Sequence, residues 1–167
     1  MKKLMIAPVM CLLIMSFTTR DRPEHELHAM MVYNFIKYIE WPNSNEEFTI
    51  GVIGNSDVFT TLHEWYGGKI RGGKKFKVVE FKSAKDLRPC SIIYFGSSSK
   101  DELRIIIDRV KNKPTLLITN KSGFAQQGSA INFKTVGNSL KFELNQEAIK
   151  AANLKVSSQL AAMAIVL

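Results

Sequence analysis

Two short stretches of the sequence are apolar throughout and contain no glycine or proline: Ser91–Phe95 (SIIYF) and Thr115–Thr119 (TLLIT). Strands that stay apolar without alternation are typical of a sheet that is covered on both faces. Between them, Ser99–Val110 repeats apolar residues at helical spacing, and Ser99 with Glu102 predicts a capping box. Strand, helix and strand in this order predict a mainly parallel sheet.

The same alternation continues towards the N-terminus. Phe48–Gly54 (FTIGVIG) and Phe76–Phe81 (FKVVEF) predict two more strands, and Asp57–Tyr66 predicts a helix between them. We expect Phe48–Gly54, Ser91–Phe95 and Thr115–Thr119 to be neighbouring central strands.

An amphipathic helix is predicted upstream of these strands. Between Pro23 and Glu40 the apolar positions recur every four residues, which indicates one packed face. Because the residue before a proline avoids helical geometry, Pro42 is expected to end the helix at Trp41. We expect Trp41 to be largely buried against this helix.

The pattern changes near the C-terminus. Ala130–Phe133 and Leu140–Leu144 flank Gly137-Asn138, and their alternation predicts a half-buried hairpin with Lys141 and Glu143 facing solvent. Asn145 can cap a helix that Asn153 ends, and Ser157–Val166 predicts a last helix. The predicted fold is therefore a single three-layer α/β domain, with a mainly parallel sheet, an antiparallel C-terminal hairpin and helices on both faces.

The first residues predict export. Lys2 and Lys3 precede Leu4–Phe17, an apolar run of 14 residues. That length is short for a membrane span and suits a signal peptide, whereas a retained anchor is the alternative. We expect a signal peptide over about residues 1–20, a domain over 21–167 and a periplasmic protein.

Export limits the chemistry of cysteine and the class of partner. Once Cys11 is removed with the signal peptide, Cys90 has no partner for an internal disulfide; a buried thiol and an intermolecular disulfide both remain open. Removal of the N-terminal basic residues lowers the formal charge from +8 to +5, and the excess gathers in Lys69–Lys82. This favours an acidic partner or anionic lipid over nucleic acid, which an exported protein does not meet.

Catalytic, metal and cofactor sites are not expected. Gly68–Lys75 (GKIRGGKK) nearly matches a phosphate loop, but Lys75 replaces the required hydroxyl residue and the loop follows a helix. His25 and His28 have helical spacing without further ligands, so we expect both to be solvated. No G-x-S-x-G elbow occurs.

Two candidate binding regions remain. In open α/β sheets ligands bind beyond the carboxyl ends of the strands, where small polar turns offer backbone donors, although ordinary loop chemistry explains the same residues. This crevice would be lined by Asn55, Ser56, Ser97, Ser98, Asn120, Lys121 and Ser122. Residue types typical of binding hot spots indicate a protein partner at Trp65, Tyr66, Lys69 and Arg71, unless Trp65 and Tyr66 pack inward.

Three motifs together resemble the YfiR family of bacterial periplasmic proteins. They are the F-x-K-(Y/F)-x-E-W-P pattern of Phe35–Pro42, the G-F-A-x-x-G-x-x-I-x-F pattern of Gly123–Phe133, and the closing run of Phe142–Leu160. The resemblance extends from about residue 26 to the C-terminus.

The resemblance implies a regulator without enzymatic activity. Well-known members hold an inner-membrane diguanylate cyclase inactive by contacting its periplasmic region, and thereby restrain cyclic di-GMP and biofilm formation; similar domains are joined to sensor kinases. A homodimer is also possible, and a stand-alone small-ligand binder is the alternative function. Members with four cysteines carry two disulfides, so redox control through a disulfide pair is in doubt in a chain that keeps only Cys90.

Overall fold

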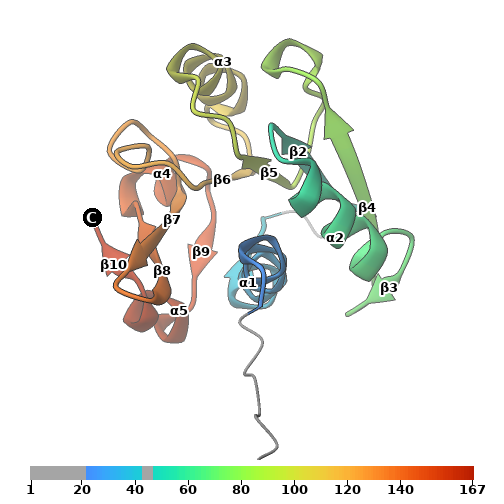
Figure 1. The fold of residues 1–167 in the computed structure, drawn as a ribbon, viewed down its shortest axis with the longest axis horizontal. Helices are drawn as coiled ribbons and strands as arrows, with labels where there is room; N and C mark the ends of the chain where they lie inside the picture. The colour runs from blue at the N-terminus through green and yellow to red at the C-terminus, as the bar shows by residue number, and fades with distance from the viewer. Residues whose placement is uncertain (1–21, 43–46) are drawn as a thin grey trace, which may run out of the picture.

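The computed structural model describes residues 22–42 and 47–167; the proposed signal peptide lies outside them. These residues form one eight-stranded sheet in the order β10-β8-β7-β6-β5-β2-β4-β3 and a two-stranded ladder of β1 and β9 (Figure 1). The strands are β1 (Ile39–Glu40), β2 (Glu47–Ile53), β3 (Ile70–Arg71), β4 (Lys74–Phe81), β5 (Ile92–Phe95), β6 (Leu116–Thr119), β7 (Ile131–Val136), β8 (Ser139–Leu144), β9 (Lys155–Val156) and β10 (Ile165–Val166). The helices are α1 (Glu24–Tyr38), α2 (Ser56–Tyr66), the 3-10 helix η1 (Ala84–Asp86), α3 (Lys100–Val110), α4 (Gln146–Ala151) and α5 (Ser158–Met163).

The sheet is mainly parallel, as the sequence predicts. Strands β4, β2, β5, β6 and β7 run parallel in that order, while β3 and β8 are antiparallel to their neighbours β4 and β7. The three predicted central strands correspond to β2, β5 and β6, which are adjacent. The expected α/β architecture with an antiparallel C-terminal hairpin is confirmed.

Helices cover both faces of the sheet. Along β5, Ile92 and Tyr94 belong to the core that includes α1 and α2, whereas Ile93 and Phe95 belong to a second core beneath α3. Figure 1 shows the sheet curving around α1, with α3 on its outer side. Burial on both faces explains why β5 and β6 are apolar at every position.

Helix α1 ends earlier than Pro42 suggested. Tyr38 is its last residue, and Ile39 and Glu40 are extended because they pair with Val156 and Lys155. Trp41 is half-buried rather than largely buried, and its ring packs edge-on against Phe48, with centroids 4.9 Å apart. A pairing with residues far along the chain therefore sets the end of this helix.

The predicted caps are confirmed, with one difference. Asn145 accepts a hydrogen bond from the Ala148 N–H, and Asn153 has a φ of 52° after α4. Ser99 caps α3, but the capping box is incomplete because the Glu102 carboxylate accepts from the Ala84 N–H instead.

The last predicted helix is too long. Helix α5 ends at Met163, and Ile165–Val166 are extended because they pair with β8 to form the edge strand β10. No helix within the described ranges is both long and apolar enough to cross a membrane.

The hairpin has the expected turn, but its burial differs from the prediction. Val136 pairs with Ser139 across Gly137-Asn138, and Gly137 has a φ of 60°. Both faces are buried at the base, so Glu143 is only 4% exposed instead of facing solvent. Its carboxylate accepts hydrogen bonds from Asn132 at 2.9 Å and Lys134 at 3.3 Å, which satisfies the buried charge.

Candidate functional site

A concave surface beside the N-terminal helix combines aromatic rings with cations. We call it the aromatic–basic groove; its volume is about 270 Å³ and it is lined by Tyr33, Ile36, Lys37, Arg71, Gly72, Lys74 and Phe76. Helix α1 supplies one wall, and the β3–β4 hairpin supplies the other. The helical spacing of Tyr33, Ile36 and Lys37 places these side chains together on one side of α1.

Stacked rings hold Arg71 in place. The rings of Tyr33 and Tyr66 lie parallel with centroids 4.9 Å apart, and the Arg71 guanidinium lies 5.6 Å and 5.5 Å from the two centroids. Burial raises the pKa of Tyr66 above its ordinary value, so the ring remains neutral. The rings therefore attract the guanidinium through their faces, by about 0.5–1 kcal/mol at an exposed site.

The four residues predicted to contact a partner are in different environments. Tyr66 is 8% exposed and belongs to the core, and Trp65 is half-buried and edge-on to it. The Lys69 ammonium donates to the carbonyls of Glu64 and Trp65 at the end of α2. Of the four, Arg71 lines the groove.

Sequence reasoning did not find the other half of this groove. Tyr33 and Lys37 lie in the predicted amphipathic helix, and Lys37 also belongs to its family pattern, but neither is among the predicted site residues. A signal for the groove is present in the aromatic and basic side chains of this helix and of the Lys69–Lys82 segment. Lys74 also lies over aromatic rings, 5.2 Å from the centroid of Phe48 and 5.9 Å from that of Trp41.

At the carboxyl ends of the strands, three of the predicted crevice residues make local hydrogen bonds. Asn55 caps α2 by accepting from the Val58 N–H, Ser56 donates to Glu80, and Ser97 accepts from the Ser99 N–H. The loops after β2 and β5 also touch directly, because a Cβ atom added at Gly54 would lie 2.8 Å from the Ser97 nitrogen. This close contact leaves little room between the two loops.

Asn120, Lys121 and Ser122 lie in the loop after β6, where Lys121 is half-buried and Ser122 is exposed. Ser98, in the loop after β5, is also exposed. The Asn120 Oδ1 atom is buried and has no hydrogen-bond partner among the described residues. Such an atom is rare in native proteins, and a ligand donor would satisfy it. It is therefore a feature of this edge that points towards binding.

His28 is buried near the same edge, so the expectation of a solvated histidine is wrong. Its Nδ1 atom lies 2.8 Å from the Tyr94 hydroxyl, and its ring stacks on Phe133 at 4.2 Å. Burial, with smaller contributions from Lys121 and His25, lowers the pKa of His28 to about 4. The imidazole is therefore neutral near pH 7.

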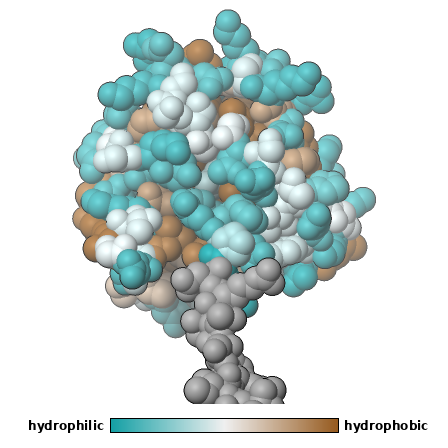
Figure 2. All heavy atoms as spheres, viewed as in Figure 1, coloured by the Kyte–Doolittle hydropathy of each residue, from teal (hydrophilic) through white to brown (hydrophobic). Residues whose placement is uncertain are grey.

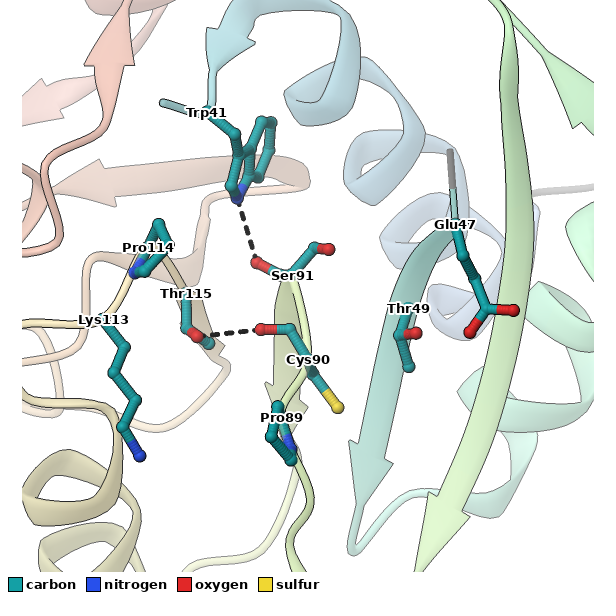
Figure 3. Close-up of a pocket in the computed structure, with 9 residues that line it drawn as sticks. All are labelled: Trp41, Glu47, Thr49, Pro89, Cys90, Ser91, Lys113, Pro114 and Thr115. Atoms are coloured by element: carbon teal, nitrogen blue, oxygen red, sulfur yellow. Dashed lines mark hydrogen bonds between the residues drawn. The ribbon is translucent and has the colours of Figure 1, made fainter. Parts of the chain in front are cut away.

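A larger cavity lies at the opposite, amino-terminal edge of the sheet (Figure 3). Its volume is about 520 Å³, and it is lined by Trp41, Glu47, Thr49, Pro89, Cys90, Ser91, Lys113, Pro114 and Thr115. The Trp41 indole donates to the Ser91 carbonyl at 3.2 Å, and the Thr115 hydroxyl donates to the Cys90 carbonyl at 2.8 Å. None of the predicted crevice residues lines this cavity.

Cys90 is a buried free thiol, in agreement with the first of the two possibilities for this residue. Burial raises the pKa of Cys90 to about 11, so the thiol stays protonated near pH 7. Because the thiolate is the nucleophile, this cysteine is poorly suited to react.

An exposed apolar surface lies at the edge of the sheet formed by β10. We call it the C-terminal edge; it consists of Met163, Ile165, Val166 and Leu167. Figure 2 shows hydrophobic atoms gathered at the lower left, over α5 and β10. Exposed edge strands of this kind are ready to pair with another chain.

Comparison with known proteins relates this chain to one family. The model of a family described as YfiR/HmsC-like matches residues 25–165. A search of curated proteins gives no significant match. Among solved structures, a conserved domain protein from Vibrio cholerae O1 biovar eltor str. N16961 is similar in fold, with a TM-score of 0.52 and 11% identity over 87% of this chain. The match spans 60% of that longer protein. Because the family model covers most of the present chain, residues 25–165 of 167, the chain belongs to the YfiR/HmsC-like family.

Proposed function

We propose that this protein is a periplasmic regulator that binds the periplasmic part of an inner-membrane signalling protein and holds it inactive. The match to the YfiR/HmsC-like family over residues 25–165 carries the proposal. The favoured partner is a diguanylate cyclase, with cyclic di-GMP and biofilm formation as the outputs, and a sensor kinase is the other partner class. Residues 1–20 would be a signal peptide, and residues 21–167 the exported domain.

Two surfaces support recognition of a protein. The aromatic–basic groove presents Arg71 and Lys37 beside aromatic rings, and the C-terminal edge presents an apolar strand. Aromatic residues and arginine are enriched where protein interfaces gain most of their affinity. Trp65 and Lys69, which are close to Tyr66 and Arg71 in the chain, remain proposed contacts.

The interior gives no support for catalysis. Among the described residues, the groups with a clearly shifted pKa are His28, Tyr66, Cys90 and Tyr94, and all four are buried. No group of three metal-ligating side chains occurs within the same residues. A regulator that acts through surface contact requires neither a reactive side chain nor a bound metal.

Gene deletion tests the proposal. Loss of a repressor would raise cyclic di-GMP and biofilm mass, and a second deletion that removes the cyclase would restore both to the wild-type level. Unchanged cyclic di-GMP, with no sensor-kinase output affected, would contradict the proposal.

A stand-alone small-ligand binder is the second candidate. The unpartnered Asn120 Oδ1 atom and the cavity of about 520 Å³ at the other edge support it. Native mass spectrometry of the protein purified from the periplasm would detect a retained ligand. Loss of that ligand in Asn120→Ala, but not in Thr49→Ala, would assign it to the predicted crevice, and the reverse to the amino-edge cavity.

A further inference from the structure

We propose that the aromatic–basic groove is the docking site for an acidic segment of the regulated membrane protein. An apolar side chain of that segment would pack on Tyr33, and its carboxylates would pair with Arg71 and Lys37. The inference rests on the proposed function for the identity of the partner, whereas the chemistry of the segment follows from the groove.

The groove carries positive charge that no carboxylate among the described residues neutralises. Among the described residues no carboxylate lies within the salt-bridge distance of 4.0 Å of Arg71, Lys37 or Lys74. Each of these cations lies over an aromatic ring instead. Ring faces do not cancel the positive charge, so the groove attracts anionic groups.

Arg71 is already positioned for binding by its aromatic neighbours. The guanidinium lies 5.6 Å and 5.5 Å from the ring centroids of Tyr33 and Tyr66, and Tyr66 is anchored in the core. The planar fork of arginine donors matches a carboxylate in two parallel hydrogen bonds. Because the side chain is held before binding, less conformational entropy is lost on association.

The shape of the groove also favours a protein segment. At about 270 Å³ the groove is slightly smaller than the roughly 300–1,000 Å³ of small-molecule pockets, so it suits a protruding side chain better than a free ligand. Its floor includes Phe76, which is buried. An apolar side chain between acidic neighbours would cover this floor and reach the cations at the rim.

The geometry disfavours a lipid surface. Ile70 is 72% exposed and precedes Arg71 in β3. Consecutive residues of a strand point to opposite faces, so Ile70 and the cations of the groove cannot both contact one flat bilayer. A concave recess with an aromatic floor is also inaccessible to a flat membrane surface.

The experiment uses the exported chain to capture its partner from solubilised membranes, identifies that partner by mass spectrometry, and then titrates the partner's purified periplasmic region. We expect Arg71→Glu and Lys37→Glu each to weaken binding by about tenfold or more, with weaker wild-type binding at higher salt. Lys100→Glu is the matched control, because it makes the same charge change at an exposed position at the start of α3. It should bind like the wild type.

Each contrary outcome has a distinct meaning. Capture of no membrane protein with a periplasmic region would overturn the proposed function and the inference with it. Normal affinity in both variants would overturn the groove alone and leave the proposed function standing. Equal loss of binding to phosphatidylglycerol vesicles in the two groove variants, with protein binding intact, would reassign the cations to lipid. Lys37→Glu lies outside the stacked tyrosines, so it tests the surface even if Arg71→Glu lowers stability.

Discussion

His28 couples folding to pH. It is 1% exposed and packed between Tyr94 and Phe133, with Glu24, His25 and Lys121 as the nearby charged or titratable groups. Its pKa falls from 6.5 in the unfolded chain to about 4, so the unfolded state binds more protons between these values. Stability is therefore complete above about pH 6.5 and decreases as the pH falls towards 4, by roughly 3 kcal/mol in total.

Urea unfolding measured from pH 4 to pH 7 tests this coupling. In His28→Gln the side chain no longer titrates, so the slope of the unfolding free energy with pH should be smaller than in the wild type. His63→Gln is the control, at an exposed position of α2. An equal slope in the wild type and in His28→Gln would contradict the assignment.

Glu143 is the second residue on which the free energy of unfolding is expected to depend strongly. Its buried carboxylate depends on Asn132, which in turn accepts from the Thr119 hydroxyl at 2.7 Å, and on the half-exposed Lys134. Asn132→Leu would leave the charge with one partner, and we expect a loss of about 1–3 kcal/mol in the free energy of unfolding.

A double-mutant comparison separates the effect of losing the Asn132–Glu143 hydrogen bond from the effect of altered packing. Adding Glu143→Leu to Asn132→Leu removes the stranded charge, so part of the lost stability should return. If the double variant is less stable than Asn132→Leu, the carboxylate does not depend on Asn132. Lys141→Ala, at the exposed position opposite Lys134, should change stability by less than about 0.5 kcal/mol.

The start of helix α4 depends on the Asn145 side chain, which makes two hydrogen bonds. Asn145 accepts from the Ala148 N–H at 3.0 Å and donates to the Ala125 carbonyl at 2.8 Å, which ties the loop after β6 to the helix start. We expect Asn145→Ala to lower the free energy of unfolding by about 1–3 kcal/mol. Asn145→Asp keeps the cap but loses the donor, so its effect should be intermediate. Equal effects of the two substitutions would show that the cap contributes nothing.

Elements defined by local pattern could be predicted, and elements defined by distant partners could not. The apolar runs of β5 and β6 and the caps Ser99 and Asn145 were recognisable because their causes lie within a few residues. Strands β1, β9 and β10 are two residues long and exist only through pairing. The burial of Glu143 likewise depends on Asn132 across the hairpin.

The residues of the candidate site also divide into those that residue type alone could predict and those that depend on contacts between distant segments. Arg71 was found because its residue type is common in interfaces, whereas Tyr33 joined the groove only when α1 packed beside the β3–β4 hairpin. The stacking of Tyr33 on Tyr66 joins two helices that no sequence period connects. The predicted crevice residues remain candidates, with Asn120 the best supported by the structure.

For the whole molecule, the C-terminal edge predicts self-association. Strand β10 pairs with β8 on one side, and Ile165, Val166 and Leu167 are exposed. We expect a homodimer in which two β10 strands meet around a two-fold axis. Sedimentation equilibrium should show a dimer for the wild type and a monomer for Ile165→Lys, with Val136→Lys, at another exposed apolar position, as the control. A monomeric wild type at micromolar concentration would contradict this assembly.

The ladder of β1 and β9 also governs when the domain can finish folding. Ile39 pairs with Val156, on the order of a hundred positions away, and the Ser157 N–H donates to the Tyr38 carbonyl. Closing so long a loop is slow, because the chain loses much entropy before the contact forms. Under the proposed export, with the N-terminus crossing the membrane first, α1 would emerge early and yet be locked only after residue 157 arrives. The chain would thus stay incompletely folded, and able to thread through a translocon, until nearly all of it had passed.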